Sequence, residues 1–287
     1  MRVLFVHAHP DDESIATGVT IGAFAAAGYE VHVLTCTLGE QGEVIARELQ
    51  HLDADHEDAL GPYRLGEWRA ALAALGATGH LLGDPHGVAP AYRDSGMAGS
   101  ASSQRSDAFV HADLGAAIAM ARAVIEQVAP EVVITYDQHG GYAHPDHIQA
   151  HRVACAAVAS MAQPPRMYAV VTPRSWVAQD RAWLAEHVRE AGVTVPAPDD
   201  PVTESTLDDD RVAYAVSDPE GAARQVAALR AHTTQVTVRQ GWFTLSNDIA
   251  ARLSGREGFA PLDPATGLLR SVPGPAGAQP GAAGWPV

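Results

Sequence analysis

Several features that define other protein classes are scarce or missing in this sequence. Its 287 residues include two cysteines, Cys36 and Cys155, and each lies in an apolar run. We therefore predict buried free thiols rather than a disulfide framework, which fits a reducing, cytoplasmic compartment. No Gly-x-Gly-x-x-Gly follows the first apolar run, so the fingerprint of dinucleotide-binding domains is absent.

Basic residues are also few. The sequence has 19 Lys and Arg residues against 34 Asp and Glu residues, a formal net charge of −15. This balance argues against nucleic acid or an anionic membrane as a partner, and is compatible with a small neutral substrate. The start of the chain lacks a long apolar segment after basic residues, so we expect neither a signal peptide nor a membrane span. The sequence does not indicate an oligomeric state.

The sequence does contain a regular alternation of apolar strands and helical patterns. A strand over residues 3–6, a small-residue helix over 14–27 and a strand over 30–36 open the chain as β-α-β. Further helices are expected at 44–60, 64–75, 112–129, 145–161, 175–191 and 218–231, and strands at 80–82, 131–136, 166–172 and 212–216. This alternation predicts an α/β fold with a mostly parallel, Rossmann-like sheet flanked by helices.

The chain is expected to divide into three parts. Residues 1–172 form an α/β core that carries the chemistry, and residues 173–272 form a smaller C-terminal part that completes the fold and the substrate cleft. Residues 273–287 are rich in Pro and Gly, lack packing side chains, and are predicted to be a disordered tail. Within the core, residues 83–107 show little periodicity and predict a long loop of the kind that often binds ligands.

Two clusters of His and Asp each follow a strand pattern and precede a helix. The first is His-Pro-Asp-Asp-Glu at residues 9–13, and the second is His-Pro-Asp-His at residues 144–147. Open α/β sheets bind ligands at the carboxyl ends of their strands. We therefore hypothesise that these two strand ends lie side by side and share one metal ion. Either motif alone arises readily by chance, so the prediction depends on their joint occurrence.

The residue types suit a hydrolytic metal site. His9, Asp12 and His147 would supply three ligands and leave one position for water, whose pKa such an ion lowers from about 16 toward about 7. Zn²⁺ is the first choice, although Fe²⁺ and other divalent ions also accept two His and one Asp. The native metal is not fixed by these residues.

Neighbouring residues acquire catalytic roles in this hypothesis. Asp11 is placed to take a proton from the water as general base, and Tyr142, on a Gly-rich stretch, to bind the oxyanion. A charged His144 would stabilise the oxyanion or protonate the leaving amine. Asp146 would orient His144, although taken alone it is more typical of a helix cap. Together these residues indicate metal-assisted hydrolysis of an amide.

At these residues the chain resembles the zinc-dependent deacetylases related to N-acetylglucosaminyl-phosphatidylinositol de-N-acetylase. Both hallmark motifs are present, and within the family the chain is most similar to the deacetylases of mycothiol biosynthesis. The supporting stretches, which reach to about residue 248, are residues 6–14, 35–40, 92–97, 135–137, 140–142 and 232–235. The resemblance implies removal of acetate from N-acetylglucosaminyl-inositol, with zinc on His9, Asp12 and His147.

The resemblance also implies substrate-binding residues. Arg64 and Asp94 would hold the sugar hydroxyls, with Glu43 near the site and Arg93 beside Asp94 in the long loop. From its position alone, Arg64 would be a plain residue at the start of a helix. Relatives that cleave mycothiol S-conjugates carry a Lys soon after the first motif, and residues 13–18 here contain none.

Two rival functions stay open at this point. One is the mycothiol S-conjugate amidase, or a deacetylase of another N-acetyl sugar. The other is a metal-dependent sugar-binding protein without turnover, for which Asp11 would have no catalytic purpose.

Overall fold

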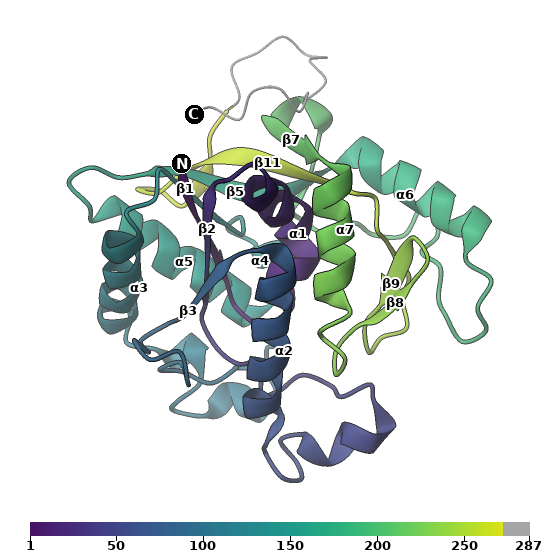
Figure 1. Cartoon of the computed structure of the whole chain (residues 1–287), viewed down its shortest axis with the longest axis horizontal. Helices are drawn as coiled ribbons and strands as arrows, with labels where there is room; N and C mark the ends of the chain where they lie inside the picture. The colour runs from purple at the N-terminus through teal and green to yellow at the C-terminus, as the bar shows by residue number, and fades with distance from the viewer. Residues whose placement is uncertain (272–287) are drawn as a thin grey trace.

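The computed structural model describes residues 1–271, so the predicted tail at 273–287 lies outside the described residues. A twisted central sheet crosses the molecule (Figure 1). Its strands, in spatial order, are β12 (Leu268–Leu269), β11 (Arg256–Asp263), β5 (Arg166–Pro173), β4 (Val132–Thr135), β1 (Arg2–His7), β2 (Glu30–Thr35) and β3 (Thr78–Leu81). The strands from β5 to β3 are parallel, and β11 runs antiparallel to β5. The predicted α/β class with a mostly parallel sheet is confirmed.

Two shorter strands extend this sheet and three others form a second sheet. β6 (Thr206–Leu207) pairs with β5, and β7 (Tyr214–Ser217) pairs with β11. The second, antiparallel sheet consists of β8 (Thr237–Arg239), β9 (Trp242–Thr244) and β10 (Ala251–Arg252). Residues after 173 therefore contribute to the central sheet through β6, β7, β11 and β12.

Helices cover both faces of the central sheet. In the described chain they are α1 (Asp12–Ala26), α2 (Leu60–Leu75), α3 (Leu114–Val128), α4 (Gly140–Ala143), α5 (Pro145–Ala159), α6 (Arg174–His187) and α7 (Pro219–Leu229). The helices α3 and α5 lie on one side of the strands, and α1, α2 and α7 lie on the other (Figure 1). The fold is thus a three-layer α/β/α arrangement. The helix α6 packs beside the second sheet, β8–β10, which we call the small sheet.

The sequence of β1 explains the two layers. Alternate side chains of a strand point to opposite faces of the sheet. Leu4 and Val6 join the core under α3 and α5, whereas Val3 and Phe5 join the core under α1, α2 and α7. All four side chains are buried, which is why the run is continuously apolar rather than alternating.

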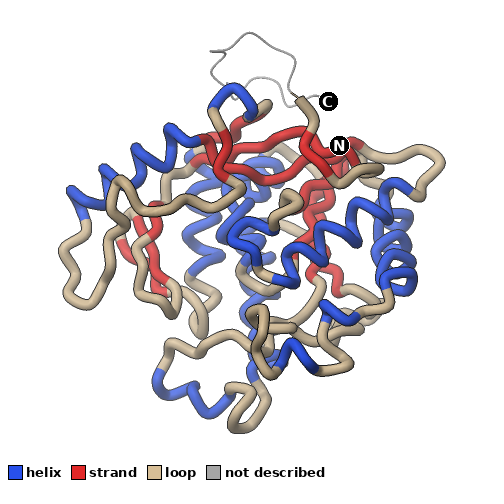
Figure 2. Tube along the Cα trace, turned by 180° about the vertical axis from the view of Figure 1, so that it is seen from behind, coloured by secondary structure: helices blue, strands red, loops and turns tan. Residues whose placement is uncertain are grey.

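The strand order determines where a ligand can bind. From β1 the sheet continues to β2 and β3 on one side and to β4 and β5 on the other. The carboxyl ends of β1 and β4 therefore flank the point at which the strand order reverses, the usual ligand position in such sheets. These strand ends point toward the lower end of the molecule, where loops and short helical turns predominate (Figure 2).

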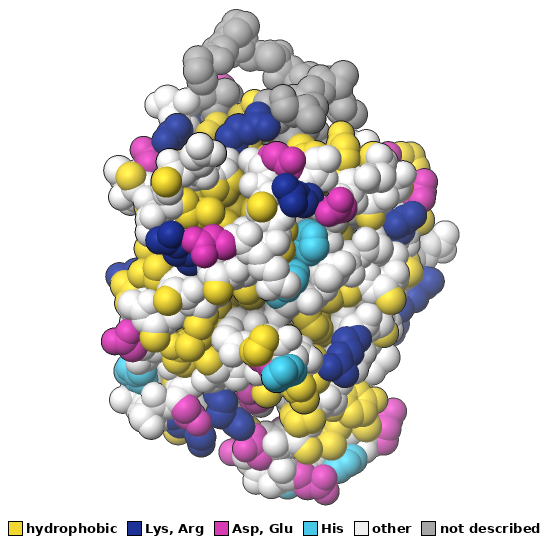
Figure 3. Space-filling view, turned by 60° about the vertical axis from the view of Figure 1, so that its left-hand side comes forward, with side chains coloured by type: hydrophobic (Ala, Val, Ile, Leu, Met, Phe, Trp, Pro, Cys, Tyr) yellow, Lys and Arg dark blue, Asp and Glu magenta, His cyan; other side chains and the backbone are white. Residues whose placement is uncertain are grey.

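Most predicted elements are present, and one is wrong. The helices and strands expected from the apolar periodicity after residue 64 all occur, with ends shifted by a few residues, as does the long loop over 83–107. The helix expected at 44–60 is absent, because this polar segment forms only a short 3₁₀ turn, Arg47–Leu52, followed by a turn in which Asp53 accepts the Asp55 N–H. Acidic and histidine side chains gather at this lower end in Figure 3.

Cys36 and Cys155 are both buried and free, as predicted. No helix within residues 1–271 is both long enough and apolar enough to cross a membrane.

The close packing of α1 against α7 depends on glycine. A Cβ added to Gly221 of α7 would lie 2.2 Å from the carbonyl oxygen of Val19 in α1. Backbone cannot move aside as a flexible side chain does, so the two helices would have to separate. Gly66, in α2, faces open space instead.

We predict opposite effects of alanine at these two glycines. Gly221→Ala should destabilise the fold by about 1–3 kcal/mol through overpacking. Gly66→Ala should stabilise it by up to about 1 kcal/mol, because alanine favours an exposed helix interior. Urea unfolding of both variants measures the two changes, and equal stability of the two proteins would contradict the close helix contact.

Candidate active site

The two predicted clusters lie at the ends of neighbouring strands. β1 pairs with β4 in parallel, with Phe5 opposite Ile134. The chain leaves β1 into residues 9–13 and leaves β4 into residues 136–147, so both clusters emerge at one edge of the sheet. The hypothesis that these two strand ends lie side by side is confirmed.

Asp12 lies between the imidazoles of His9 and His147. Its Oδ2 is 3.4 Å from His9 Nδ1, and its Oδ1 is 3.3 Å from His147 Nε2. All three side chains are buried, and the centroids of the two rings are 5.3 Å apart. The structure thus brings the three predicted metal ligands together, with one ring nitrogen facing each oxygen of the carboxylate.

The other ring nitrogen of each histidine already has a partner. His147 Nδ1 donates to the carbonyl oxygen of Gly140 at 3.1 Å, and His9 Nε2 donates to the carboxylate of Asp146 at 3.3 Å. The lone pairs of His9 Nδ1 and His147 Nε2 then face the Asp12 carboxylate, an arrangement that suits a bridging cation. His147 Nε2 is buried and lacks a hydrogen-bond partner among the described residues. This donor set fits a divalent metal ion.

Carboxylates around His9 favour positive charge at this point. Burial alone would lower the pKa of His9, but Asp94, Asp12 and Asp146 together raise it well above its ordinary value. Burial would likewise raise the pKa of Asp12, yet His147 and His9 hold it well below its ordinary value. A buried site with this excess of anionic groups attracts a cation.

Two groups of three potential ligand atoms in the described residues lie within 4.8 Å of one another, and neither includes Asp12. One replaces Asp12 with His144, and the other joins His9 to Asp94 and Asp146. His144 Nδ1 already accepts the Asp146 backbone N–H at 3.1 Å. The carboxylates of Asp94 and Asp146 accept backbone N–H groups of Gly96 and Ser95 respectively. The trio His9, Asp12 and His147 therefore offers the more available donor atoms and stays our prediction.

Asp11 has a backbone conformation that few residues adopt. Its φ is 109°, a region that usually requires glycine and that strains other residues by about 1–3 kcal/mol. Its carboxylate lies 3.0 Å from the Arg64 guanidinium. Burial raises the pKa of Asp11 to about 6, even though Arg64 acts in the opposite direction. Such a group can both accept and return a proton near neutral pH.

Arg64 is buried and acts mainly on the chain itself. Its guanidinium donates to the carbonyl oxygens of Gly39, at 2.7 Å, and Pro10. An added Cβ at Gly39 would displace this guanidinium, and the φ of 63° at Gly39 also favours glycine. Arg64 also lines the cavity beside the predicted metal ligands, which we call the cleft. Its predicted contact with a substrate stays a proposal.

Tyr142 and His144 flank the predicted metal ligands. The Tyr142 ring is half exposed, 5.0 Å from the His147 ring and 5.9 Å from the His144 ring, measured between centroids. Next to it, Gly141 interrupts α4 with φ 74°. His144 caps α5, and burial together with His9 and His147 lowers its pKa to about 3. His144 is therefore neutral here, and not the charged imidazole considered from the sequence.

Asp146 does not orient His144 in the expected way. Its carboxylate is fully buried and contacts His9 and the Ser95 hydroxyl, whereas only its backbone N–H reaches His144. The reason is the cap itself. His144 directs Nδ1 at the first turn of α5, so the Asp146 side chain projects toward β1 instead. Asp146 is therefore placed to orient His9.

Arg93 is also placed differently from the prediction. Its guanidinium pairs with the exposed Asp58 at 2.5 Å, and it is not among the residues that line the cleft. Consecutive residues of an extended segment point to opposite sides. Because Asp94 faces the cleft, with Oδ1 3.4 Å from His9 Nε2, Arg93 faces away from it.

A cavity of about 680 Å³ opens beside the predicted ligands. The exposed Glu43 lies on its rim, and Arg64 and Asp94 line its wall. Another part of its lining comes from the antiparallel sheet β8–β10 and its loops, through the apolar Phe243, Leu245, Ile249 and Ala251 and the polar Ser246 and Asn247. From the sequence, residues 173–272 were expected to complete the cleft, but none of these wall residues was named, because no element was identified between residues 232 and 271.

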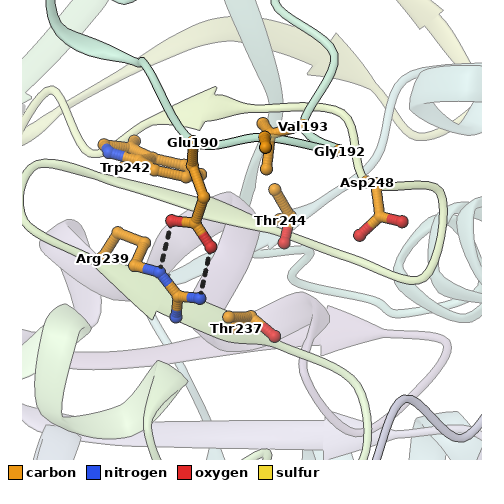
Figure 4. Close-up of a pocket in the computed structure, with 9 residues that line it drawn as sticks. Glu190, Gly192, Val193, Thr237, Arg239, Trp242, Thr244 and Asp248 are labelled. Atoms are coloured by element: carbon orange, nitrogen blue, oxygen red, sulfur yellow. Dashed lines mark hydrogen bonds and ion pairs between the residues drawn. The ribbon is translucent and has the colours of Figure 1, made fainter.

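Further hollows are present in the described part of the chain, and one of about 470 Å³ lies between the segment around Tyr142 and residues 201–204. A chamber of about 380 Å³ adjoins the site and shares Asp12 and Tyr142 with the cleft. A smaller hollow of about 200 Å³ lies between β8, β9 and the loop after α6 (Figure 4). Two of its three charged residues, Arg239 and Glu190, are paired through two hydrogen bonds, at 2.7 and 2.8 Å, and it contains none of the predicted site residues.

Several residues that support the site were not predicted as functional. Ser95 donates its N–H and its hydroxyl to Asp146, and the ring of Tyr136 stacks on His147 with centroids 4.3 Å apart. Glu13, in the first motif, forms a buried ion pair with His232. Sequence signals existed for all of them, because each falls in a stretch that supported the family resemblance.

Comparisons with known proteins agree with the motifs. Residues 4–158 match the family model described as PIG-L, GlcNAc-PI de-N-acetylase. A relative from Geodermatophilus obscurus, named 1D-myo-inositol 2-acetamido-2-deoxy-alpha-D-glucopyranoside deacetylase, is 45% identical over 270 residues, which cover 89% of this chain and 90% of the relative.

Solved structures share the fold at lower sequence identity. A deacetylase–teicoplanin complex from teicoplanin biosynthesis is 19% identical, with a TM-score of 0.52 and coverage of 82% of this chain and 87% of that one. A 4-carboxy-2-hydroxymuconate hydratase from Pseudomonas putida, also 19% identical, has a TM-score of 0.50 over 82% of this chain and 79% of its own. The family match covers both His/Asp motifs and more than half of the sequence, and on that ground the chain belongs to the GlcNAc-PI de-N-acetylase family, as its motifs predicted.

Proposed function

We propose that the protein is a metal-dependent deacetylase that hydrolyses the N-acetyl group of N-acetylglucosaminyl-inositol to glucosaminyl-inositol and acetate, a step of mycothiol biosynthesis. The observation that carries the proposal is the position of Asp11, a buried carboxylate with a raised pKa that lines the same cleft as His9 and Asp12. The name of the relative from Geodermatophilus obscurus supports the choice of substrate.

The residues that would hold the metal are His9, Asp12 and His147. A divalent cation there would polarise the acetyl carbonyl and acidify a water molecule. Zn²⁺ is our first choice, and Fe²⁺ is the main alternative for this donor set. Asp146 keeps the His9 ring in the tautomer whose Nδ1 is free, through the contact at 3.3 Å.

The chain's own groups then account for the proton movements. Asp11 takes a proton from the attacking water as its oxygen bonds to the acetyl carbon. The Tyr142 hydroxyl donates a hydrogen bond to the resulting oxyanion, and neutral His144 is a donor beside it. The C–N bond breaks as the amine nitrogen gains the proton that Asp11 took from the water. His144, whose pKa is lowered to about 3, is neutral and does not supply this proton. Acetate and the free amine are the products.

The large cleft is the proposed sugar site. Arg64, Asp94 and Glu43 would bind hydroxyl groups of the substrate, whereas Arg93 is withdrawn from this set because it faces Asp58. We propose that residues 173–272 complete the cleft of the core formed by 1–172, since Phe243 and Leu245 line it. A small amino-sugar inositol is then the partner, and neither nucleic acid nor a membrane is required. The buried free thiols suit a cytoplasmic location.

Replacement of the proposed base should abolish most turnover. In Asp11→Asn the amide cannot accept a proton, so we expect kcat/KM for N-acetylglucosaminyl-inositol to fall about 100- to 10,000-fold. In the wild type, activity should fall as pH drops, because a proton then occupies Asp11. Without a metal ion the pKa of Asp11 is about 6, and a bound cation would lower it from that value. The acidic limb should therefore lie at or below about pH 6. Appearance of the primary amine measures both effects.

Binding measurements provide the control for this variant. Asp11→Asn should still bind metal and sugar, since none of the three proposed ligands has changed. Acetate release at the wild-type rate would remove Asp11 from the mechanism. A wild-type protein that binds the sugar without any turnover would instead support a non-catalytic sugar-binding protein.

Metal content separates the proposed ligands from their neighbours. Protein purified without added metal should contain about one divalent ion per chain, and His147→Ala should lose it together with activity. His139→Ala is the matched control, because His139 lies in the same segment but pairs with the exposed Glu204 at 2.7 Å. His144→Ala should also keep the ion. Loss of metal in His144→Ala, with retention in Asp12→Ala, would favour the three-histidine arrangement.

The chamber behind Tyr142 favours one rival function. Its volume of about 380 Å³ is larger than an acetyl group needs. The chamber could therefore hold a larger acyl group attached to the substrate nitrogen. This is the property that a mycothiol S-conjugate amidase would need. Comparing kcat/KM for N-acetylglucosaminyl-inositol with that for bimane-labelled mycothiol decides between the two. We expect the acetylated sugar to be preferred, and a strong preference for the conjugate would assign the amidase function.

A further inference from the structure

The conformation of Asp11 needs an explanation that the proposed ligands do not provide. A non-glycine residue with φ 109° persists only if its surroundings hold it there. Its carbonyl oxygen accepts the N–H groups of Ser14 and Ile15, as the start of α1 requires. Its own N–H points the other way and donates to Glu13 Oε2 at 3.0 Å. The Glu13 carboxylate therefore stabilises the unusual turn from within.

Glu13 could not fill this position without a partner. It is completely buried, and a buried carboxylate is unfavourable unless it is paired and fully hydrogen-bonded. Its Oε1 accepts hydrogen bonds from the Ser14 hydroxyl and from His232 Nε2, the latter at 2.9 Å. His232 is equally buried, and the hydrogen bonds of its side chain within the described chain go to Glu13 and Ser14.

We infer that Glu13 and His232 form a buried positioning pair that holds the Asp11 backbone in its catalytic conformation. Neither side chain lines the cleft, so neither is a catalytic residue by contact. The pair acts through one hydrogen bond, from the Asp11 N–H to Glu13. This inference rests on the proposed role of Asp11 as base. It assigns a function to His232, which lies 219 positions from Glu13 in the sequence.

The position of His232 is itself well anchored. It follows α7, which packs closely against α1 at Gly18, Gly22 and Gly221. The next residues are fixed to α2, because Glu67 accepts three hydrogen bonds of 2.7–2.8 Å from Thr233 and Thr234. The segment at 232–235 is thus held by two buried carboxylates. One of them contacts Asp11 and the other does not, which supplies a matched pair for experiment.

The test compares Glu13→Gln with Glu67→Gln. Each replaces a buried carboxylate that binds the same segment, so both should lower the melting temperature to a similar degree. In Glu13→Gln the single carbonyl oxygen of the new amide cannot accept both the Asp11 N–H and the His232 N–H. We therefore expect kcat of Glu13→Gln to fall about 10- to 100-fold through misplacement of the base. The KM and the metal content should stay within about twofold of wild type, and kcat of Glu67→Gln within about threefold.

Variants of the histidine give a graded response. His232→Gln keeps a donor that can reach Glu13 and should retain more activity than His232→Ala. Equal kcat in Glu13→Gln and wild type would overturn the inference. Loss of kcat in Glu67→Gln as large as that in Glu13→Gln would also overturn it, because a general weakening of the segment would then suffice.

A structural readout separates this inference from the proposed function. If the wild type fails to hydrolyse N-acetylglucosaminyl-inositol, the proposed function fails, and kinetics no longer report on the pair. The crystal structure of Glu13→Gln decides in that case. Relaxation of Asp11 to negative φ supports the positioning pair, and a φ that stays near 109° overturns it.

Discussion

The parallel pairing of β1 with β4 is the contact on which the site depends. It brings His9 within 3.3 Å of Asp146, 137 residues further along the chain. The pairing is stable because β1 is buried on both faces, so it cannot shift by one residue without exchanging Val3 and Phe5 for Leu4 and Val6 between two different cores. Packing far from the chemistry therefore fixes the distance between the two clusters.

A second constraint is electrostatic. Asp11, Asp12 and Glu13 follow one another, and Asp94 and Asp146 approach the same region from other elements. Two of these carboxylates have basic partners within the protein: Arg64 faces Asp11, and His232, whose pKa the Glu13 carboxylate raises, faces Glu13. Asp12 instead faces His9 Nδ1 and His147 Nε2, the two ring nitrogens that would share a metal ion with it. The arrangement therefore favours binding of a metal cation next to Asp12.

The sequence was sufficient for the core of the site and insufficient for its surroundings. Local patterns identified the strands and helices, and the motif residues His9, Asp12 and His147 converge as expected. Side-chain direction could not be predicted in the loop at 83–107, where Asp94 faces the cleft and Arg93 faces away from it. The short strands β8–β10 also escaped prediction, because two or three residues carry too little periodicity. These are the regions where tertiary contacts, and not local propensity, determine the structure.

The family's fold does not by itself determine a reaction, since a hydratase shares it at a TM-score of 0.50. What the fold supplies is a switch point where two strand ends and two helix starts meet. The choice of chemistry then lies in backbone details such as the φ of 109° at Asp11, which directs one carboxylate into the cleft while the next, that of Asp12, is directed at the histidines. Adjacent residues with opposite tasks require such a turn, because an ordinary helix start would point Asp11 and Asp12 in fixed directions about 100° apart. The strain at Asp11 is therefore the feature that separates the proposed base from the proposed metal ligand within one dipeptide.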